Sequence, residues 1–194
     1  MKKIILLFIF MYLTTSSLFA INESEIDSTI NKTTDNIIKV VLNKELEKQK
    51  KYDLIEKNLS IIFDYNTMAK IVLSKKYKKL SKDMKDRFVL AFTNKLKDSY
   101  SSKLDMYKGE PIVISKFKKT KSTRGTITIT LKLTGSDVVF IYKLYRKRNT
   151  KEWFIYDFVI ENISIVQTYR KQFQGFLKTK TMEELIVKLN TKED

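Results

Sequence analysis

The hydrophobic pattern of this chain changes period near Gly109 and Pro111, and this change limits the fold class more than any other feature. Before it, apolar residues recur every three or four positions, as on the buried stripe of a helix. After it, apolar and polar residues alternate, as in a strand with one buried face, and helical spacing returns only near the end. Helices, then strands, then helices again predict an α+β fold rather than alternating βα units.

Helical spacing also gives approximate boundaries. Ser81 is a good N-cap for a long helix with an aromatic-rich stripe, which Gly109 and Pro111 would end. Asp64 is expected to cap a shorter helix. The predicted helices are 23–50, 53–63, 66–73, the long helix that starts after Ser81, 162–177 and 182–189.

The strands are expected to form an antiparallel meander. The predicted strands are 111–120, 125–135, 137–147 and 153–161, with a two-residue turn at Gly135-Ser136. In the second strand Ile127, Ile129, Leu131 and Leu133 point the same way. The last two strands carry large apolar residues on both faces, so their sheet should be covered on both sides or curl around an interior.

The first 20 residues have the pattern of a secretory signal peptide. Lys2 and Lys3 precede an apolar run over 4–13, and Ala20 offers a small residue for cleavage. Ten residues of helix rise only about 15 Å, too little for a hydrocarbon core of about 30 Å. We therefore predict a cleaved signal peptide over 1–20 and one exported domain over 21–194, with an uncleaved anchor as the alternative.

Composition narrows the possible chemistry. The chain has no His and no Cys, which removes the usual zinc sites and the common nucleophile–base pairs. The net charge of +16 favours anionic partners, although export argues against nucleic acid. The densest basic cluster, residues 75–80, is expected to be a solvated face, with docking of its lysines on acidic surfaces as the alternative.

Two segments together resemble a known family. The first contains Phe63-Asp64, Met68-Ala69 and Arg87-Phe88. The second contains, in order, Trp153, Tyr156-Asp157, Ile160-Glu161, Ser164, Tyr169-Arg170 and Phe173. This ordered set resembles the periplasmic MlaC family of phospholipid-binding proteins over roughly residues 30–190. Asn162 stands where that family commonly has Gly, and Asn tolerates a positive φ better than most residues.

The resemblance implies both a fold and a function. The fold would be a bent antiparallel sheet, similar to nuclear transport factor 2, whose N-terminal and C-terminal helices enclose an apolar cavity. The protein would carry diacyl phospholipid across the periplasm between an outer-membrane lipoprotein–porin complex and an inner-membrane ABC transporter with a substrate-binding domain. This transport would maintain outer-membrane lipid asymmetry and would need no cofactor, metal or catalytic residue.

A carrier of this kind must cover an acyl chain. A chain of about 16 carbons costs on the order of 12 kcal/mol to hold in water. The residues expected to line the cavity are Phe63, Phe88, Phe92, Leu96, Tyr100, Phe158, Ile160, Ile165, Tyr169 and Phe173. Packing in the protein's own core is the alternative role for each of them.

Two other classes of function stay open. One is a periplasmic interaction module of the same fold whose core is filled by its own side chains. The other is an enzyme that works through a carboxylate such as Asp157, for which no convincing acid–base arrangement appears. We expect Asp157 to form an ion pair with Arg170 at the corner between the last strand and the following helix.

Overall fold

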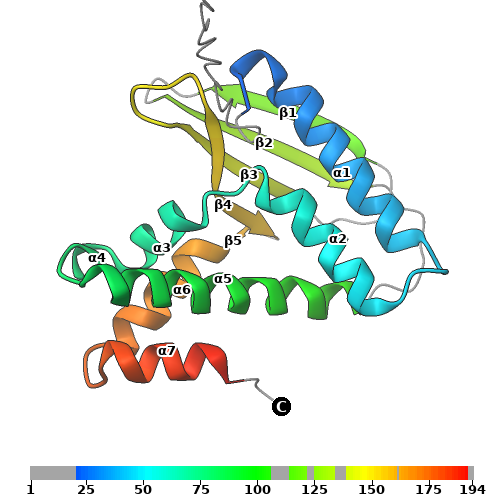
Figure 1. Cartoon of the computed structure of the whole chain (residues 1–194). Coiled ribbons are helices and arrows are strands. Elements are labelled where there is room, and N and C mark those ends of the chain that lie inside the picture. The colour runs from blue at the N-terminus through cyan, green and yellow to red at the C-terminus, as the bar shows by residue number, and fades with distance from the viewer. Residues whose placement is uncertain (1–20, 106–113, 122–124, 134–138, 161, 192–194) are drawn as a thin grey trace, which may run out of the picture.

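The structure is a computed structural model that describes residues 21–105, 114–121, 125–133, 139–160 and 162–191. The side chains of residues 100–105, 114–117 and 132–133 are not described. Helices come first, a sheet follows, and two helices close the chain (Figure 1). The predicted signal peptide, Gly109, Pro111 and the Gly135-Ser136 turn lie outside the described residues. No helix in the described ranges is long and apolar enough to cross a membrane.

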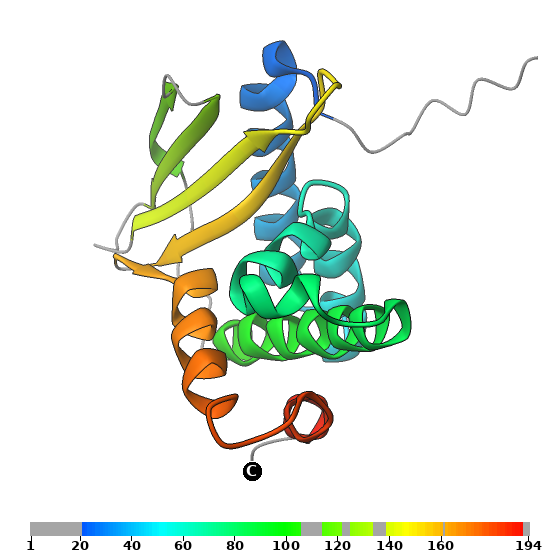
Figure 2. The ribbon, with the colours of Figure 1, turned by 90° about the vertical axis from the view of Figure 1, so that its left-hand side faces the viewer.

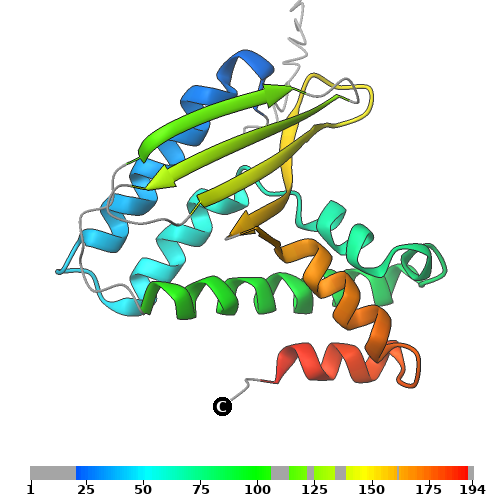
Figure 3. The ribbon, with the colours of Figure 1, turned by 180° about the vertical axis from the view of Figure 1, so that it is seen from behind.

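The sheet is an antiparallel meander in the order β1-β2-β3-β4-β5. Its strands are β1 (Ile114–Lys121), β2 (Thr126–Leu133), β3 (Val139–Arg146), β4 (Trp153–Ile160) and β5 (Ile163–Ser164). The sheet curves, and helix α1 (Ile26–Leu42) lies against one of its faces, in front of the strands in Figure 1 and behind them in Figure 3. The predicted α+β class with a curved antiparallel sheet is therefore confirmed.

The helix-covered face, called the inner face below, is set by the register of the strands. Ile127, Ile129 and Leu131 of β2 are buried on it, and they pair with Leu144, Tyr142 and Phe140 of β3. A β-bulge between β3 and β4 then pairs Leu144 with Ile155 but Tyr142 with Phe158. Because of this bulge, Ile155 and Phe158 lie on the same face although they are three residues apart.

Strand β4 would be an exposed edge over most of its length without three short segments. The backbone N–H of Trp153 donates to Ile21 (2.8 Å), and that of Ile155 donates to Ile62 (2.8 Å). The backbone N–H of Asp64 donates to Ile155 (2.9 Å), and β5 pairs with the end of β4. These bonds satisfy the backbone groups of an edge strand and bring Phe63 next to the sheet.

The prediction of one helix over 23–50 was wrong. A 3-10 turn, η1 (Glu23–Glu25), leads into α1, which ends at Leu42, and the chain returns as α2 (Lys48–Ser60). Asn43 is extended, and its side chain accepts a hydrogen bond from the backbone N–H of Glu45 (2.9 Å). Asn offers the backbone an alternative to helical bonds, so it ends the helix although the apolar spacing continues. The helix expected over 53–63 is the second part of α2.

Two of the next three helices begin at the capping residues that the sequence predicts. Asp64 caps α3 (Tyr65–Leu73) by accepting from the backbone N–H of Thr67 (2.8 Å). Ser81 caps α5 (Lys82–Asp105) by accepting from the backbone N–H of Met84 (3.1 Å). Both predicted caps are confirmed. Between them lies α4 (Lys75–Lys78), a single turn in the segment expected to be a solvated face.

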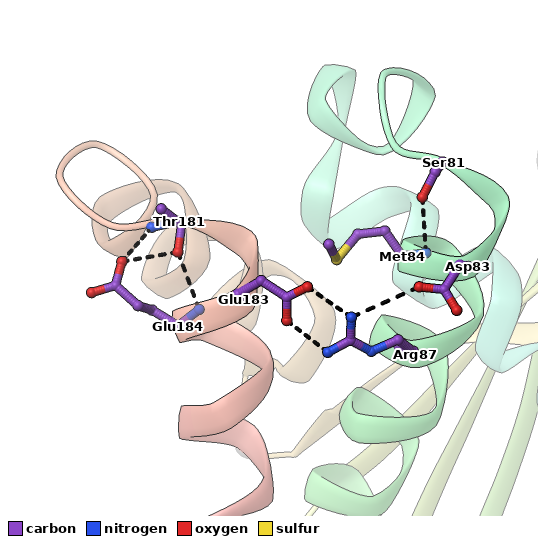
Figure 4. Close-up of polar contacts among 7 residues, drawn as sticks. All are labelled: Ser81, Asp83, Met84, Arg87, Thr181, Glu183 and Glu184. Atoms are coloured by element: carbon purple, nitrogen blue, oxygen red, sulfur yellow. Dashed lines mark hydrogen bonds and ion pairs between the residues drawn. The ribbon is translucent and has the colours of Figure 1, made fainter.

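The chain leaves the sheet through β5 and continues into the last two helices, as Figure 2 shows. Asn162 has a positive φ of 65°, which confirms that Asn supports this corner, and α6 (Ile165–Phe176) begins three residues later. Helix α7 (Met182–Asn190) packs on α5. The Arg87 guanidinium makes two hydrogen bonds to the Glu183 carboxylate, at 2.7 and 2.6 Å (Figure 4).

Candidate functional site

Four aromatic side chains join α5 to α6, and we call them the helix aromatic cluster: Phe88, Phe92, Tyr169 and Phe173. Phe88 and Phe92 stack with their ring centroids 5.8 Å apart. Phe173 meets both rings edge-on at 5.8 Å, and Tyr169 meets Phe92 edge-on at 5.4 Å. Phe88 and Phe92 are 0% exposed and Phe173 is 4% exposed. These three side chains therefore belong to the protein's own core.

A second apolar group lies on the inner face of the sheet, and we call it the sheet wall: Phe140, Tyr142, Phe158 and Ile160. Its members pair across β3 and β4, Phe140 with Ile160 and Tyr142 with Phe158. All four are half-buried, unlike the fully buried Ile129 and Leu144 on the same face. The wall thus keeps apolar surface accessible on the face that the helices cover.

Phe63 connects the wall to the core. Its ring meets Phe158 edge-on at 5.8 Å and Tyr142 edge-on at 6.3 Å, and it stacks on Tyr65 at 5.9 Å. Phe63 itself is 9% exposed. Burial raises the pKa of the Tyr142 phenol to about 12. The wall is uncharged at physiological pH, because Tyr142 stays protonated and the other three members are not ionisable.

The ten residues predicted to bind lipid divide into two groups. Five are buried, Phe63, Phe88, Phe92, Leu96 and Phe173, and four are half-buried, Phe158, Ile160, Ile165 and Tyr169. The side chain of Tyr100 lies outside the described residues. Ile165, Tyr169 and Phe158 pack against the same core cluster. The sequence interpretation missed Phe140 and Tyr142, because the bulge that aligns them with Ile160 and Phe158 has no clear sequence signal.

Asp157 fixes the corner between β4 and α6, but not with the partner expected. Its carboxylate accepts from Lys143 Nζ (2.9 Å), Ser164 Oγ (2.8 Å) and the backbone N–H of Val166 (3.2 Å). The expected ion pair with Arg170 was wrong, since Arg170 donates instead to Ser74 Oγ at 3.4 Å. Lys143 lies opposite Asp157 on β3, so cross-strand pairing determines the ion pair.

Asp64 combines its capping role with a contact to the sheet. Its carboxylate accepts from Thr67 Oγ1 (2.7 Å) and from the phenol of Tyr145 (2.5 Å). Burial alone would raise the pKa of Asp64, but the hydrogen bonds from Tyr145 and Thr67 outweigh it and lower this pKa. Burial and then the bond to Asp64 raise the pKa of Tyr145 to about 12. The pair holds α3 against β3.

The carboxylates near the site have structural roles, and the rest of the site is apolar. Asp64 and Asp157 each accept several hydrogen bonds that fix helices to strands. Within the described ranges, no group of three or more Asp, Glu, His or Cys residues could hold a metal ion. The sheet wall and the half-buried ends of α6 offer neutral apolar surface, which suits contact with hydrocarbon.

Comparison with known proteins identifies the family of this chain. A model of the MlaC protein family matches residues 31–191. The chain belongs to the MlaC family. A curated MlaC relative, the intermembrane phospholipid transport system binding protein of Haemophilus influenzae, is 26% identical over 122 residues. That region is 61% of this chain and 56% of the relative, so the match spans little more than half of the relative's length.

A solved structure shares the fold. The phospholipid-binding protein of Ralstonia solanacearum, solved in complex with a phospholipid, matches with a TM-score of 0.68 at 16% identity. The match covers 84% of this chain and 93% of that protein. Because the identity is low, this likeness concerns the fold. The MlaC resemblance noted from the sequence, and the fold class it implied, are both confirmed.

Proposed function

We propose that this protein is a periplasmic carrier that holds one diacyl phospholipid by its acyl chains. It would exchange this lipid between an outer-membrane lipoprotein–porin complex and an inner-membrane ABC transporter with a substrate-binding domain, and so maintain outer-membrane lipid asymmetry. The observation that carries the proposal is the sheet wall: four apolar side chains that stay half-buried on a face that helices cover.

The physical argument starts from that accessible apolar surface. Leaving it in contact with water is unfavourable, and each acyl CH₂ that covers it would contribute about 0.8 kcal/mol. Such binding needs neither a nucleophile nor a metal. The Haemophilus relative, named for phospholipid transport, and the Ralstonia neighbour, solved with a phospholipid, support the same ligand class.

The site we propose is smaller than the ten residues suggested by the sequence. The sheet wall would form one side, and Ile165 and Tyr169 of α6 would form the other. Phe63 would close its inner end against the core. The site would rest on four residues of the buried core: Phe88, Phe92, Leu96 and Phe173.

Location follows from the N-terminal sequence. We propose that residues 1–20 are a signal peptide cleaved after Ala20, and that residues 21–194 form the exported domain. Ile21 pairs with Trp153 at the edge of β4, which supports a domain that begins at this point.

A second candidate is an interaction module of the same fold whose interior is filled. The burial of Phe88, Phe92, Leu96 and Phe173, each at most 4% exposed, favours it for the region between α5 and α6. The two candidates differ in whether the purified protein contains lipid.

Lipid extraction tests the proposal. Protein expressed with its own N-terminus and purified gently from the periplasm should yield phospholipid in a one-to-one ratio by mass spectrometry. Phe158→Asn should lower this ratio strongly, because it places an amide in the apolar wall. Phe154→Asn is the matched control, since Phe154 is half-buried on the opposite face of the same strand. Wild-type protein without phospholipid would favour the filled module.

A further inference from the structure

Two lysine-rich turns, about a hundred residues apart in sequence, lie side by side at one end of the molecule. Helix α4 and the turn between α6 and α7 share this end in Figures 1 and 3, and Figure 2 looks directly at it. The Nζ atom of Lys76 donates to the backbone carbonyl of Leu177 (2.7 Å), which fixes the two turns to each other. We call the surface formed by five side chains here the lysine face: Lys75, Lys76, Lys78, Lys79 and Lys178.

The charge of the lysine face is uncompensated. All five side chains are exposed, and within the described part of the chain none of them makes an ion pair. The neighbouring lysines differ, since Lys82 pairs with Asp86 (2.7 Å) and Lys180 pairs with Glu184 (3.0 Å). Residues 74–82 and 176–182 contain no Asp or Glu. Five cations on one surface are therefore left without an acidic partner among the described residues.

The turn between α1 and α2 provides a comparison within the same protein. It is also rich in lysine, but Glu45 and Glu47 alternate there with Lys44 and Lys48. The basic composition of the whole chain is thus not evenly distributed. The lysine face therefore differs from the turn between α1 and α2, because no acidic residue stands among its cations.

We propose that the lysine face docks the protein on a bilayer surface of anionic phospholipid headgroups. This inference goes beyond the proposed function, because it concerns the membrane on which the protein rests and not the lipid that it holds. Lysine is a compact point charge that attracts anions without fixed geometry, whereas Arg gives the paired bonds typical of a specific carboxylate contact. All five cations of this face are Lys.

The lysine face also lacks the usual anchor of a protein interface. Protein–protein contacts depend on a few large apolar or aromatic side chains at their centre. The large apolar residues that are exposed in the described structure are Leu42, Leu90, Ile163 and Val187, and none of them belongs to the lysine face. A group of exposed lysines without such an anchor fits a diffuse anionic surface better than an acidic protein.

The expected contact is peripheral and reversible. Each Lys near an anionic membrane surface contributes about 1 kcal/mol, which is roughly fivefold in affinity. The attraction decays over a Debye length of about 10 Å at 0.1 M salt. Binding should therefore be strong at low salt, fall steeply as salt increases, and leave the acyl-chain site free.

Flotation with lipid vesicles tests the inference. The full chain is mixed with phosphatidylcholine vesicles that either contain or lack phosphatidylglycerol, and the floated fraction is measured. The test variant is K75Q/K78Q/K79Q/K178Q, which keeps Lys76 because that residue holds Leu177. The control K39Q/K44Q/K50Q/K57Q removes the same charge from exposed positions on α1, α2 and the turn between them. Circular dichroism checks that both variants are folded.

The expected result is flotation of wild type only with phosphatidylglycerol. The test variant should bind at least about thirtyfold more weakly, and the control should bind nearly as wild type does. Equal losses in the two variants would show a net-charge effect and overturn the inference. Binding that survives high salt would also overturn the inference. A third contrary outcome is wild-type protein that does not float with the vesicles but is retained on immobilised polyglutamate through the same lysines. Bound phospholipid, measured in parallel, separates this outcome from failure of the carrier function.

Discussion

The helix aromatic cluster and the sheet wall have similar side chains but different surroundings. In the cluster, Phe88 and Phe92 stack on each other and Phe173 closes them, so that almost no ring surface is exposed. In the wall, Tyr142 and Phe158 pair across two strands and touch Phe63, yet they stay half-buried. Residue type alone therefore does not separate a core from a candidate binding surface. The arrangement of the neighbouring elements does.

This difference has a structural cause. Phe88 and Phe92 on α5, and Tyr169 and Phe173 on α6, stand four residues apart on their helices. Helix α3 packs on both α5 and α6 and helps to cover these rings. The wall belongs to the sheet. There the bulge between β3 and β4 places Ile155 and Phe158 on the same face, with Ile155 in the core. Ile129 and Leu144 on this face are fully buried, whereas Tyr142 and Phe158 are only half-buried, so part of the face stays accessible.

The largest expected loss of stability is in the helix aromatic cluster. Phe92→Ala should lower the free energy of unfolding by about 3–5 kcal/mol, because it leaves a cavity among rings that cannot close around it. Urea denaturation followed by circular dichroism measures this change. Leu90→Ala on the same helix is the control, since Leu90 is 64% exposed and its loss should change stability by less than about 0.5 kcal/mol. A loss below 1 kcal/mol for Phe92→Ala would mean that the cluster is not a packed core.

The second-largest expected loss of stability is at the corner between β4 and α6, which lies between the sheet wall and the helix aromatic cluster. Asp157→Ala should cost about 2–3 kcal/mol, because Ser164 and the backbone N–H of Val166 lose their buried acceptor and Lys143 loses its partner. Arg170→Ala should cost less, since the one hydrogen bond that Arg170 makes among the described residues is to Ser74 Oγ, at 3.4 Å. Urea denaturation of the two variants compares them directly. If Arg170→Ala were the more damaging, the corner would depend on the ion pair first expected from the sequence.

Enlarging a side chain should distinguish the two regions most clearly. Phe92→Trp should cost about 1–3 kcal/mol, because a packed core has no room for the larger ring. Phe158→Trp should cost less than about 1 kcal/mol and should instead reduce the amount of bound phospholipid, because the new ring would fill space meant for the acyl chain. Thermal unfolding and lipid extraction on the same samples measure both quantities. Equal destabilisation with unchanged lipid content would show that the wall is also core.

Much of the fold could be predicted because it depends on local signals. Ser81 and Asp64 are strong N-caps, and the alternation around Ile127 and Ile129 can form only a strand with one buried face. Asn162 in positive φ is likewise a property of one residue. The break at Asn43 was missed because the apolar spacing continues through it, and only the side-chain bond to Glu45 shows where the helix ends.

The candidate site was less predictable because it depends on register. Phe88, Phe92 and Phe173 were recognised as apolar, but sequence spacing cannot tell whether another helix covers them. Phe140 and Tyr142 were missed because the bulge, which aligns them with Ile160 and Phe158, has no clear sequence signal. The partner of Asp157 was wrong for the same reason, since Lys143 becomes its neighbour only through cross-strand pairing.

The smallest effect is a pH dependence of the free energy of unfolding that comes from the contact of Asp64 with Tyr145 on β3, the strand that also carries Phe140 and Tyr142 of the wall. The folded-state pKa of Asp64 is lowered from 3.8, so its ionised form stabilises the fold fully above that value and less as the pH falls through the lower folded value. The stability difference between wild type and Asp64→Asn should therefore be largest near neutral pH and should shrink below about pH 4. Asp35→Asn, at an exposed position on α1, is the control and should leave the profile unchanged. Urea denaturation at several pH values measures the difference, and one that stays constant down to about pH 2 would mean that the bond from Tyr145 does not depend on the charge of Asp64.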